Sequence, residues 1–162
     1  MSRIPVALAL AAAVSALAAR TAAAPPRIPC GAIILRVASG RAGGYRVVLG
    51  VVSVPPAYRP QIAATGRRPW RYVSKAGLVV HGGAPPVSVS VAKAWRGRAA
   101  VSWGDSGTVS ALRIASCAAG TKPWNAYAGG FYLRDRSACV PLVFRVGART
   151  ATVRFGIGRR CP

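Results

Sequence analysis

The sequence predicts an all-β protein: an antiparallel β-sandwich of the immunoglobulin-like kind, stapled by disulfides. Short runs rich in Val, Phe and Thr recur along the chain, separated by Gly and Pro turn signals, a pattern typical of sandwiches. The chain also has four cysteines, which in a short exported domain indicate a disulfide framework. A small closed β-barrel is the alternative architecture.

The N-terminus has the layout of a secretory signal peptide. A positive charge at Arg3 precedes an alanine-rich apolar run over residues 4–19, and small residues follow it. The run is shorter than the roughly 20 apolar residues that span a bilayer. We therefore expect a signal peptide over residues 1–24, a single β-sandwich domain over residues 25–162, secretion, and no transmembrane segment after cleavage.

Two alternating segments, residues 140–146 and 151–157, predict a C-terminal β-hairpin. Their apolar faces oppose each other only if the loop has an even length, and a four-residue loop over 147–150 satisfies this. Arg145 and Arg154 then share the other face. The expected register pairs Val146 with Ala151, Phe144 with Val153, Leu142 with Phe155 and Val140 with Ile157.

Further short strands are expected before this hairpin. They cover residues 33–38, 45–54, 76–81, 86–91, 98–103 and 108–117. The first two are expected to pair across a turn at residues 39–44, and the last two across the Gly-Asp-Ser-Gly turn at 104–107. Residues 57–69, which carry several Pro and Gly, are expected to form a surface loop.

The four cysteines allow three pairings. Cys30 opens the expected domain and Cys161 nearly closes it, so we expect one bridge between them that ties down both ends. A second bridge between Cys117 and Cys139 would close an aromatic-rich loop. Metal binding is disfavoured because the chain has no CxxC spacing and a single histidine. We expect neither a metal nor a cofactor.

Charge is the strongest compositional signal. The chain carries 23 Lys and Arg residues against 2 Asp and Glu, a formal net charge of +21, whereas small designed domains aim for a magnitude of roughly 2 to 8. Guanidinium groups pair bidentately with phosphate and carboxylate. The candidate ligand-binding arginines are Arg134, Arg136, Arg145 and Arg154.

The expected partners of these arginines are an anionic envelope polymer or lipid head groups at the cell surface. Export argues against a role on chromosomal nucleic acid. The alternative is a generally cationic, solvated surface with no specific partner.

A second candidate site is aromatic. Trp124, Tyr127, Phe131 and Tyr132 lie close together around two glycines, with Asn125 as a polar neighbour. Such rings can form a platform for a sugar, with Asn125 orienting it. They can equally cap one end of the sandwich as core material beneath the disulfide.

The Gly-Asp-Ser-Gly segment at 104–107 matches the surroundings of the nucleophile in trypsin-like serine proteases. The match ends there, because residue 108 is Thr and the context of His81 is unlike that of the catalytic histidine. A triad of Ser106, His81 and Asp135 would need the fold to bring them together. Asp-Ser-Gly is also ordinary turn chemistry, so we expect no enzyme.

Three stretches carry a family resemblance: YAGGFYLRDRSACVPLVFRVGARTATVRFGIGRRC, YRVVLGVVSVPPAY and KAWRGRAAVSWG. Together they resemble an uncharacterised family of small exported actinobacterial proteins over most of the expected domain. The resemblance implies secretion and a high-GC source. It implies no activity, cofactor or site residue.

The sequence therefore favours a secreted, non-enzymatic, cationic β-sandwich that binds anionic envelope material through its arginines. One alternative is a carbohydrate-binding module that uses Trp124 and Tyr127. The other is a small serine hydrolase that uses Ser106.

Overall fold

The structure is a computed structural model that describes residues 23–162. The expected signal peptide over residues 1–24 lies almost wholly outside this part. Within residues 23–162 the longest helical segments are single 3-10 turns, and no helix is long and apolar enough to cross a membrane.

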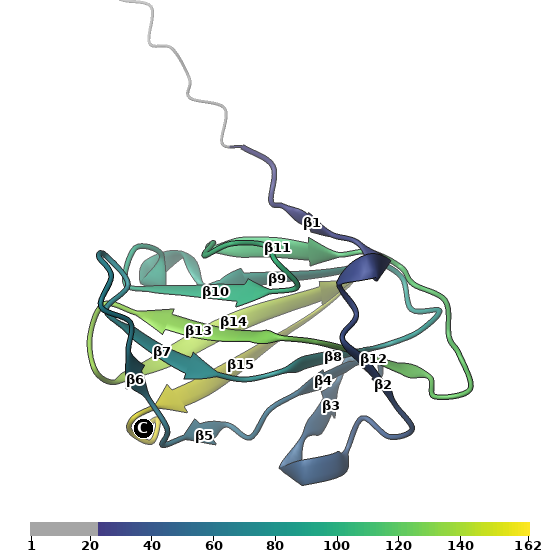
Figure 1. Cartoon of the computed structure of the whole chain (residues 1–162), viewed down its shortest axis with the longest axis horizontal. Helices are drawn as coiled ribbons and strands as arrows, with labels where there is room; N and C mark the ends of the chain where they lie inside the picture. The colour runs from purple at the N-terminus through teal and green to yellow at the C-terminus, as the bar shows by residue number, and fades with distance from the viewer. Residues whose placement is uncertain (1–22) are drawn as a thin grey trace, which may run out of the picture.

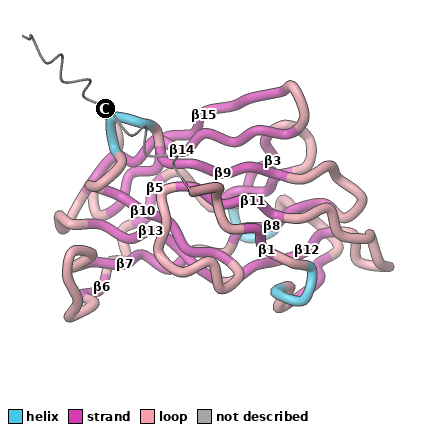
Figure 2. The backbone as a smooth tube through the Cα atoms, turned by 90° about the horizontal axis from the view of Figure 1, so that it is seen from above, coloured by secondary structure: helices cyan, strands magenta, loops and turns pink. Residues whose placement is uncertain are grey.

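The described chain folds as two layers of β-strands that share one hydrophobic core (Figure 1). Strands dominate the backbone, with short 3-10 turns between some of them (Figure 2). This confirms the all-β sandwich, and the sheets do not close into the alternative barrel. Two pairings, those of the two-residue strands β1 with β11 and β5 with β15, are parallel and depart from the antiparallel prediction.

Layer one is a single six-stranded sheet. Its spatial order is β1 (Arg27–Ile28), β11 (Ala111–Ile114), β9 (Val87–Val91), β14 (Ala138–Val146), β15 (Arg149–Ile157) and β5 (Tyr58–Arg59). In β9 the three valines are buried while Ser88 and Ser90 face outward, as the alternation predicts.

Layer two consists of two sheets joined end to end. One has the order β10 (Ala99–Trp103), β13 (Gly129–Leu133), β7 (Tyr72–Lys75) and β6 (Ala63–Ala64). The other has the order β2 (Leu35–Val37), β12 (Trp124–Tyr127), β8 (Leu78–His81), β4 (Val52–Val54) and β3 (Arg46–Val48).

A long two-stranded ribbon runs through both sheets of layer two. The pairing of β13 with β7 and that of β12 with β8 keep the same register. At the junction the Ala76 amide donates to the Gly129 carbonyl oxygen at 2.9 Å. Layer two is therefore continuous along its length, and the ribbon connects the two ends of the sandwich.

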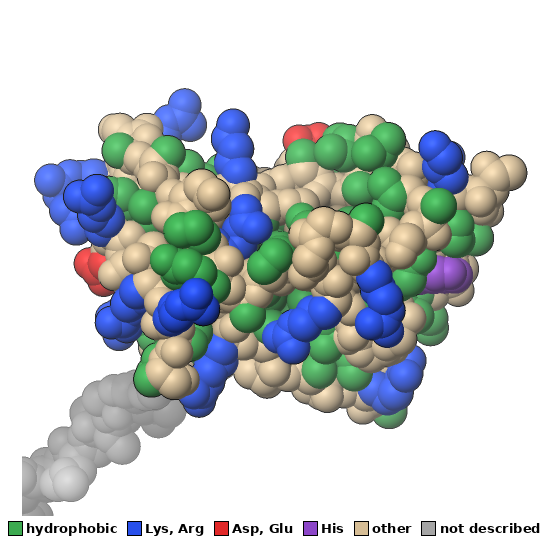
Figure 3. All heavy atoms as spheres, turned by 90° about the horizontal axis from the view of Figure 1, so that it is seen from below, with side chains coloured by type: hydrophobic (Ala, Val, Ile, Leu, Met, Phe, Trp, Pro, Cys, Tyr) green, Lys and Arg blue, Asp and Glu red, His purple; other side chains and the backbone are tan. Residues whose placement is uncertain are grey.

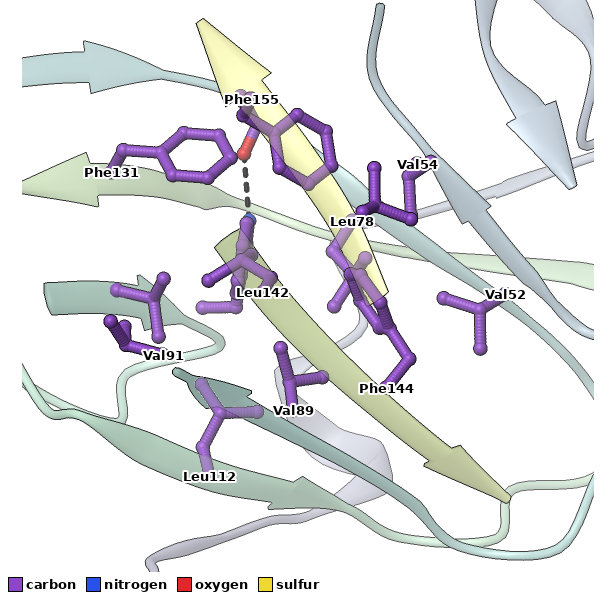
Figure 4. Packing of buried hydrophobic residues seen from close by; sticks show 14 of the residues in the cluster. Val52, Val54, Leu78, Val89, Val91, Leu112, Phe131, Leu142, Phe144 and Phe155 are labelled. Carbon is purple, nitrogen blue, oxygen red and sulfur yellow. Dashed lines mark hydrogen bonds between the residues drawn. The ribbon is translucent and has the colours of Figure 1, made fainter. Parts of the chain in front are cut away.

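The core fills the space between the layers (Figure 4). Phe131 of β13 and Phe155 of β15 meet across it with ring centroids 5.0 Å apart, and each fully buried side chain of this size contributes about 1.5–3 kcal/mol. The other labelled members are Val52, Val54, Leu78, Val89, Val91, Leu112, Leu142 and Phe144.

The C-terminal hairpin forms with a register different from the predicted one. Val146 pairs with Arg149, so the connection has two residues rather than four, and Phe144 pairs with Ala151 rather than Val153. Gly147 adopts a φ of 57°, which permits the tighter turn. Because the shift is two residues, the apolar faces still meet in the core.

The N-terminal strands pair differently from the prediction as well. The run over 45–54 is divided by a turn at Leu49 and Gly50, with φ of 53° and 75°, so β3 pairs with β4. The segment predicted to pair with it instead supplies β2, which pairs with β12. The sequence does not predict this turn because leucine rarely adopts a positive φ.

The turn at residues 104–107 forms as predicted, but the chain then leaves for the other layer. Gly104 and Asp105 both have positive φ, and the Ser106 amide donates to the Trp103 carbonyl. Only the bridge between Val101 and Val109 links the two flanking segments. The predicted loop over 57–69 contains the short strands β5 and β6.

The disulfide pairing differs from the expected one. All four cysteines are bonded, but as Cys30–Cys117 and Cys139–Cys161. The parallel strands β1 and β11 end side by side, which brings Cys30 next to Cys117. Cys139 lies opposite Gly156 in the hairpin, and the chain after β15 folds back so that Cys161 reaches it. The first bridge thus fastens the N-terminal end of the domain to the segment after β11, and the second fastens the C-terminal end to β14.

Candidate anion-binding surfaces

The structure does not gather the four candidate arginines into one site. Arg145 and Arg154 lie on the outer face of layer one, as predicted, and both are exposed. Arg134 and Arg136 lie in the loop between β13 and β14. Arg145 lies near the far end of β14 from that loop, about 23 Å along the strand. The two pairs therefore belong to different surfaces.

Arg134 belongs to a cluster at one end of the sandwich. Three loops meet there, namely those between β6 and β7, between β9 and β10, and between β13 and β14 (Figure 1). Figure 3 shows Lys and Arg side chains gathered at the left-hand end of the view. We call this cluster the arginine end and define it as Arg67, Arg68, Arg71, Arg98 and Arg134.

One acidic side chain lies within the arginine end. Asp135 is 4.0 Å from Arg71 and 4.0 Å from Arg98, one guanidinium at each carboxylate oxygen. All three side chains are more than half exposed, and exposed ion pairs of this kind contribute roughly 0–1 kcal/mol. Asp135 balances one of five charges, so the cluster stays strongly cationic.

Aromatic rings support the guanidinium groups. Arg98 lies over Trp95 with 4.6 Å between its Cζ and the ring centroid, and Arg134 lies over Trp70 at 5.8 Å. Arg71 Nε donates to the Arg134 carbonyl oxygen at 2.9 Å. Stacking on a ring limits the motion of an arginine and leaves its N–H groups available. The cluster is therefore partly organised for a ligand.

A surface hollow lies among these side chains. It has a volume of about 380 Å³ and is lined by Arg68, Pro69, Arg71, Arg134 and Asp135. Guanidinium forks suit the oxygens of carboxylate and phosphate. The hollow can therefore receive one anionic group of a larger ligand.

Arg136 lies beside the C-terminal segment. Its carbonyl oxygen approaches Gly158 closely, and Arg159 and Arg160 follow in sequence. Arg160 stacks on Tyr58 with 4.6 Å between Cζ and the ring centroid. These residues extend the cationic surface next to the arginine end.

The aromatic candidates do not form a platform. Trp124 is half-buried, whereas Asn125 and Tyr127 are 1 % exposed, because residues 124–127 alternate between the two sides of β12. The Asn125 Oδ1 accepts from Arg36 Nε at 3.2 Å. The amide side chain is therefore oriented by a contact within the protein and not toward a ligand. Burial raises the pKa of Tyr127, and the charge of Arg36 opposes this rise.

The predicted triad does not assemble. Ser106 Oγ accepts from the Trp103 amide at 3.2 Å and donates to the Gly107 carbonyl oxygen at 2.9 Å. Both hydrogen bonds stabilise the turn that contains Ser106. His81 lies opposite Trp124 on β8, while Asp135 follows β13 at the far end of the ribbon, about 35 Å along the strand. Within residues 23–162 no group of three or more His, Cys, Asp or Glu side chains could hold a metal ion.

In comparisons with known proteins, no protein-family model, curated protein or solved structure matches this chain. The resemblance to an exported actinobacterial family stays a prediction. We therefore infer a function from the charges and contacts described above.

Proposed function

We propose that the protein is exported and binds an anionic polymer of the cell envelope through the arginine end, without an enzymatic step. The observation that carries the proposal is the convergence of three guanidinium groups, those of Arg68, Arg71 and Arg134, from two loops on one hollow. Asp135 also lines this hollow, and Arg98 of a third loop lies 4.0 Å from its carboxylate. The two disulfides suit an oxidising, extracellular environment.

A polymer is favoured over a lipid surface. Proteins that enter a bilayer interface present apolar side chains as well as cations. Among residues 23–162 the exposed large hydrophobic side chains are Ile34, Leu35 and Tyr58, and none belongs to the arginine end. Trp70 and Trp95 are half-buried and stack with arginines. Binding should therefore be electrostatic and should weaken with salt.

The test is retention of the purified protein on cell-wall material across a salt series. We expect Arg68→Gln/Arg134→Gln to be released at clearly lower salt than the wild type, because both side chains line the hollow. Arg41→Gln/Arg46→Gln is the matched control: it removes the same charge from exposed positions in and next to layer two. Equal release of the two variants would contradict the proposal and favour a diffuse cationic surface.

A further inference from the structure

The outer face of layer one carries a second cationic surface, separate from the arginine end. The strand register aligns one residue from each of five neighbouring strands in a row across the sheet. Because paired residues point to the same side of a sheet, all of them face outward. We call this set the outer-face row, and it consists of Arg27, Arg113, Ser88, Arg145 and Thr150.

The row is linear and regularly spaced. Neighbouring strands lie about 4.8 Å apart, so the five positions span roughly 19 Å. Ser88 lies between Arg113 on one side and Arg145 on the other, each one strand away. An anionic group above Ser88 is therefore within reach of two guanidinium groups and one hydroxyl.

A hollow of about 260 Å³ lies over this part of the sheet. Ser88 and Ser90 form its floor, and Arg96 and Arg145 are among the residues at its rim. Ala111 and Val143, which pair with Ser90 on the two neighbouring strands, are short as well, so long arginine side chains form only part of the rim. Arg113 lies beside Ser88 but is not among the lining residues. None of the side-chain hydrogen bonds found in residues 23–162 involves Ser88 or Ser90, so both hydroxyls are free to donate.

The five strands of the row carry no acidic side chain and no exposed aromatic ring. The only acidic residues of the chain are Asp105 and Asp135, and both lie in loops outside the strands of the row. Asp105 lines a separate hollow together with Arg27, at the β1 end of the row. Strands β1, β9 and β11 contain no aromatic residue, and Phe144 and Phe155 of β14 and β15 are buried. Stacked bases of single-stranded nucleic acid would need exposed rings. The exposed ring of layer one, that of Tyr58, lies on the edge strand β5 beyond β15, outside the hollow, and stacks with Arg160.

We propose that the outer-face row binds a linear phosphate-bearing polymer that lies across the strands, with one phosphate held over Ser88 and Ser90. The tetrahedral oxygens of a phosphate accept simultaneously from a floor below and from guanidinium groups on either side. A planar carboxylate has two oxygens in one plane, so it can accept from fewer of these donors at the same time than a phosphate can. The proposal rests on the proposed function only in taking an anionic polymer as the ligand; it adds the phosphate chemistry and uses a different surface.

The test measures Kd for long-chain inorganic polyphosphate, tripolyphosphate and polyglutamate of matched charge. We expect Arg113→Gln/Arg145→Gln to weaken long-chain polyphosphate binding about tenfold or more, as expected for lost charge-assisted hydrogen bonds. Tripolyphosphate, which is too short for the row, should bind more weakly than the long chain to the wild type. The matched control is again Arg41→Gln/Arg46→Gln, which changes the net charge equally.

A variant without any charge change separates a built site from general attraction. Ser88→Ala/Ser90→Ala should reduce the preference for polyphosphate over polyglutamate while leaving polyglutamate affinity unchanged. If this preference is unaffected, or if the two arginine double variants lose polyphosphate equally, the outer-face row is not the site. Tighter binding to anionic phospholipid vesicles or to single-stranded DNA than to polyphosphate would also overturn the proposal.

The two proposals fail separately. Loss of polyphosphate binding in Arg68→Gln/Arg134→Gln but not in Arg113→Gln/Arg145→Gln would leave the arginine end as the binding surface and reject the outer-face row. The opposite outcome is unchanged cell-wall retention in Arg68→Gln/Arg134→Gln with weakened polyphosphate binding in Arg113→Gln/Arg145→Gln. It would reject the arginine end as the binding surface and support the outer-face row.

Discussion

Trp124 lies against the backbone of Gly40, so closely that a Cβ at this glycine would come within 2.8 Å of the ring atoms Cη2, Cζ2 and Cζ3. The Ser53 hydroxyl donates to the Gly40 carbonyl oxygen and holds the loop in this position. On β8 the His81 ring meets the indole edge to face, with centroids 5.0 Å apart. Trp124 therefore packs the loop between β2 and β3 against layer two. This packing explains why Trp124, a candidate ligand-binding residue, is half-buried.

Substitution at this contact should destabilise the fold. We expect Gly40→Ala to lower the free energy of unfolding by about 1–3 kcal/mol, because the added methyl must push the indole or the loop aside. Urea unfolding at constant m-value measures the change. Gly31→Ala is the control, since no atom lies within 4 Å of a Cβ there, and an equal loss in both variants would argue against the contact.

Removing the two disulfides should have unequal effects. The Cys30–Cys117 bridge has a sequence separation of 87 and the Cys139–Cys161 bridge one of 22. Chain-entropy reasoning gives about 4.5 and about 3.5 kcal/mol respectively. We expect Cys30→Ser/Cys117→Ser to unfold at lower urea than Cys139→Ser/Cys161→Ser.

The pairing itself is tested by a single substitution. Cys117→Ser should leave Cys30 as a free, exposed thiol that reacts with an alkylating reagent, and peptide mapping identifies the labelled residue. Labelling of Cys139 instead would restore the pairing expected from the sequence.

Tyr127 should make stability depend on alkaline pH. Burial raises its pKa above the ordinary value of about 10, so the folded state keeps the phenol proton at a pH where the unfolded chain loses it. The contribution of Tyr127 to the free energy of unfolding is complete below about pH 10 and decreases as the pH rises towards the folded-state pKa. Urea midpoints of wild type and Tyr127→Phe should therefore converge or cross above pH 10. Parallel pH profiles would show that the phenol titrates normally.

Ser106 should matter for the turn and not for hydrolysis. Ser106→Ala removes two hydrogen bonds within residues 103–107 and should cost about 0.5–1.5 kcal/mol each at most. Any background hydrolysis of ester or peptide substrates should be the same for both proteins. A large loss of hydrolytic rate in the variant would revive the serine hydrolase alternative.

Asp135 should weaken the binding of anions by occupying two arginines. Asp135→Asn removes the carboxylate between Arg71 and Arg98, so we expect retention on cell-wall material to persist to higher salt. Asp105→Asn, in a turn outside the arginine end, makes the same charge change as a control. An effect of equal size from both variants would indicate net charge alone.

The alternation of apolar residues was sufficient to predict the sandwich and the buried faces of β9, β14 and β15. It does not determine which strands become neighbours. A two-residue shift in the C-terminal hairpin leaves every face unchanged, so parity cannot detect it. The disulfides were mispaired for the same reason: the short parallel pairing of β1 with β11 places Cys30 beside Cys117, and a two-residue strand leaves little periodic signal.

The candidate sites, too, could be predicted from the sequence only in part. The outward face of Arg145 and Arg154 follows from alternation and was predicted. The arginine end was not, because Arg71, Arg98 and Arg134 come from three loops that only the tertiary fold brings together. The available signal was local: two of these loops place arginine within a few residues of tryptophan, a combination suited to stacking.

The order of strand pairing has a consequence for the time course of folding. The first two strands pair with much later ones, β1 with β11 and β2 with β12, and β5 pairs with the last strand, β15. Long-range pairings of this kind form slowly because a large loop must close first. When a chain emerges N-terminus first from a ribosome or an export channel, these segments have no pairing partners until the C-terminal strands have emerged. The fold is therefore complete only after the whole domain has emerged. Until then the chain stays unfolded enough to pass through a channel.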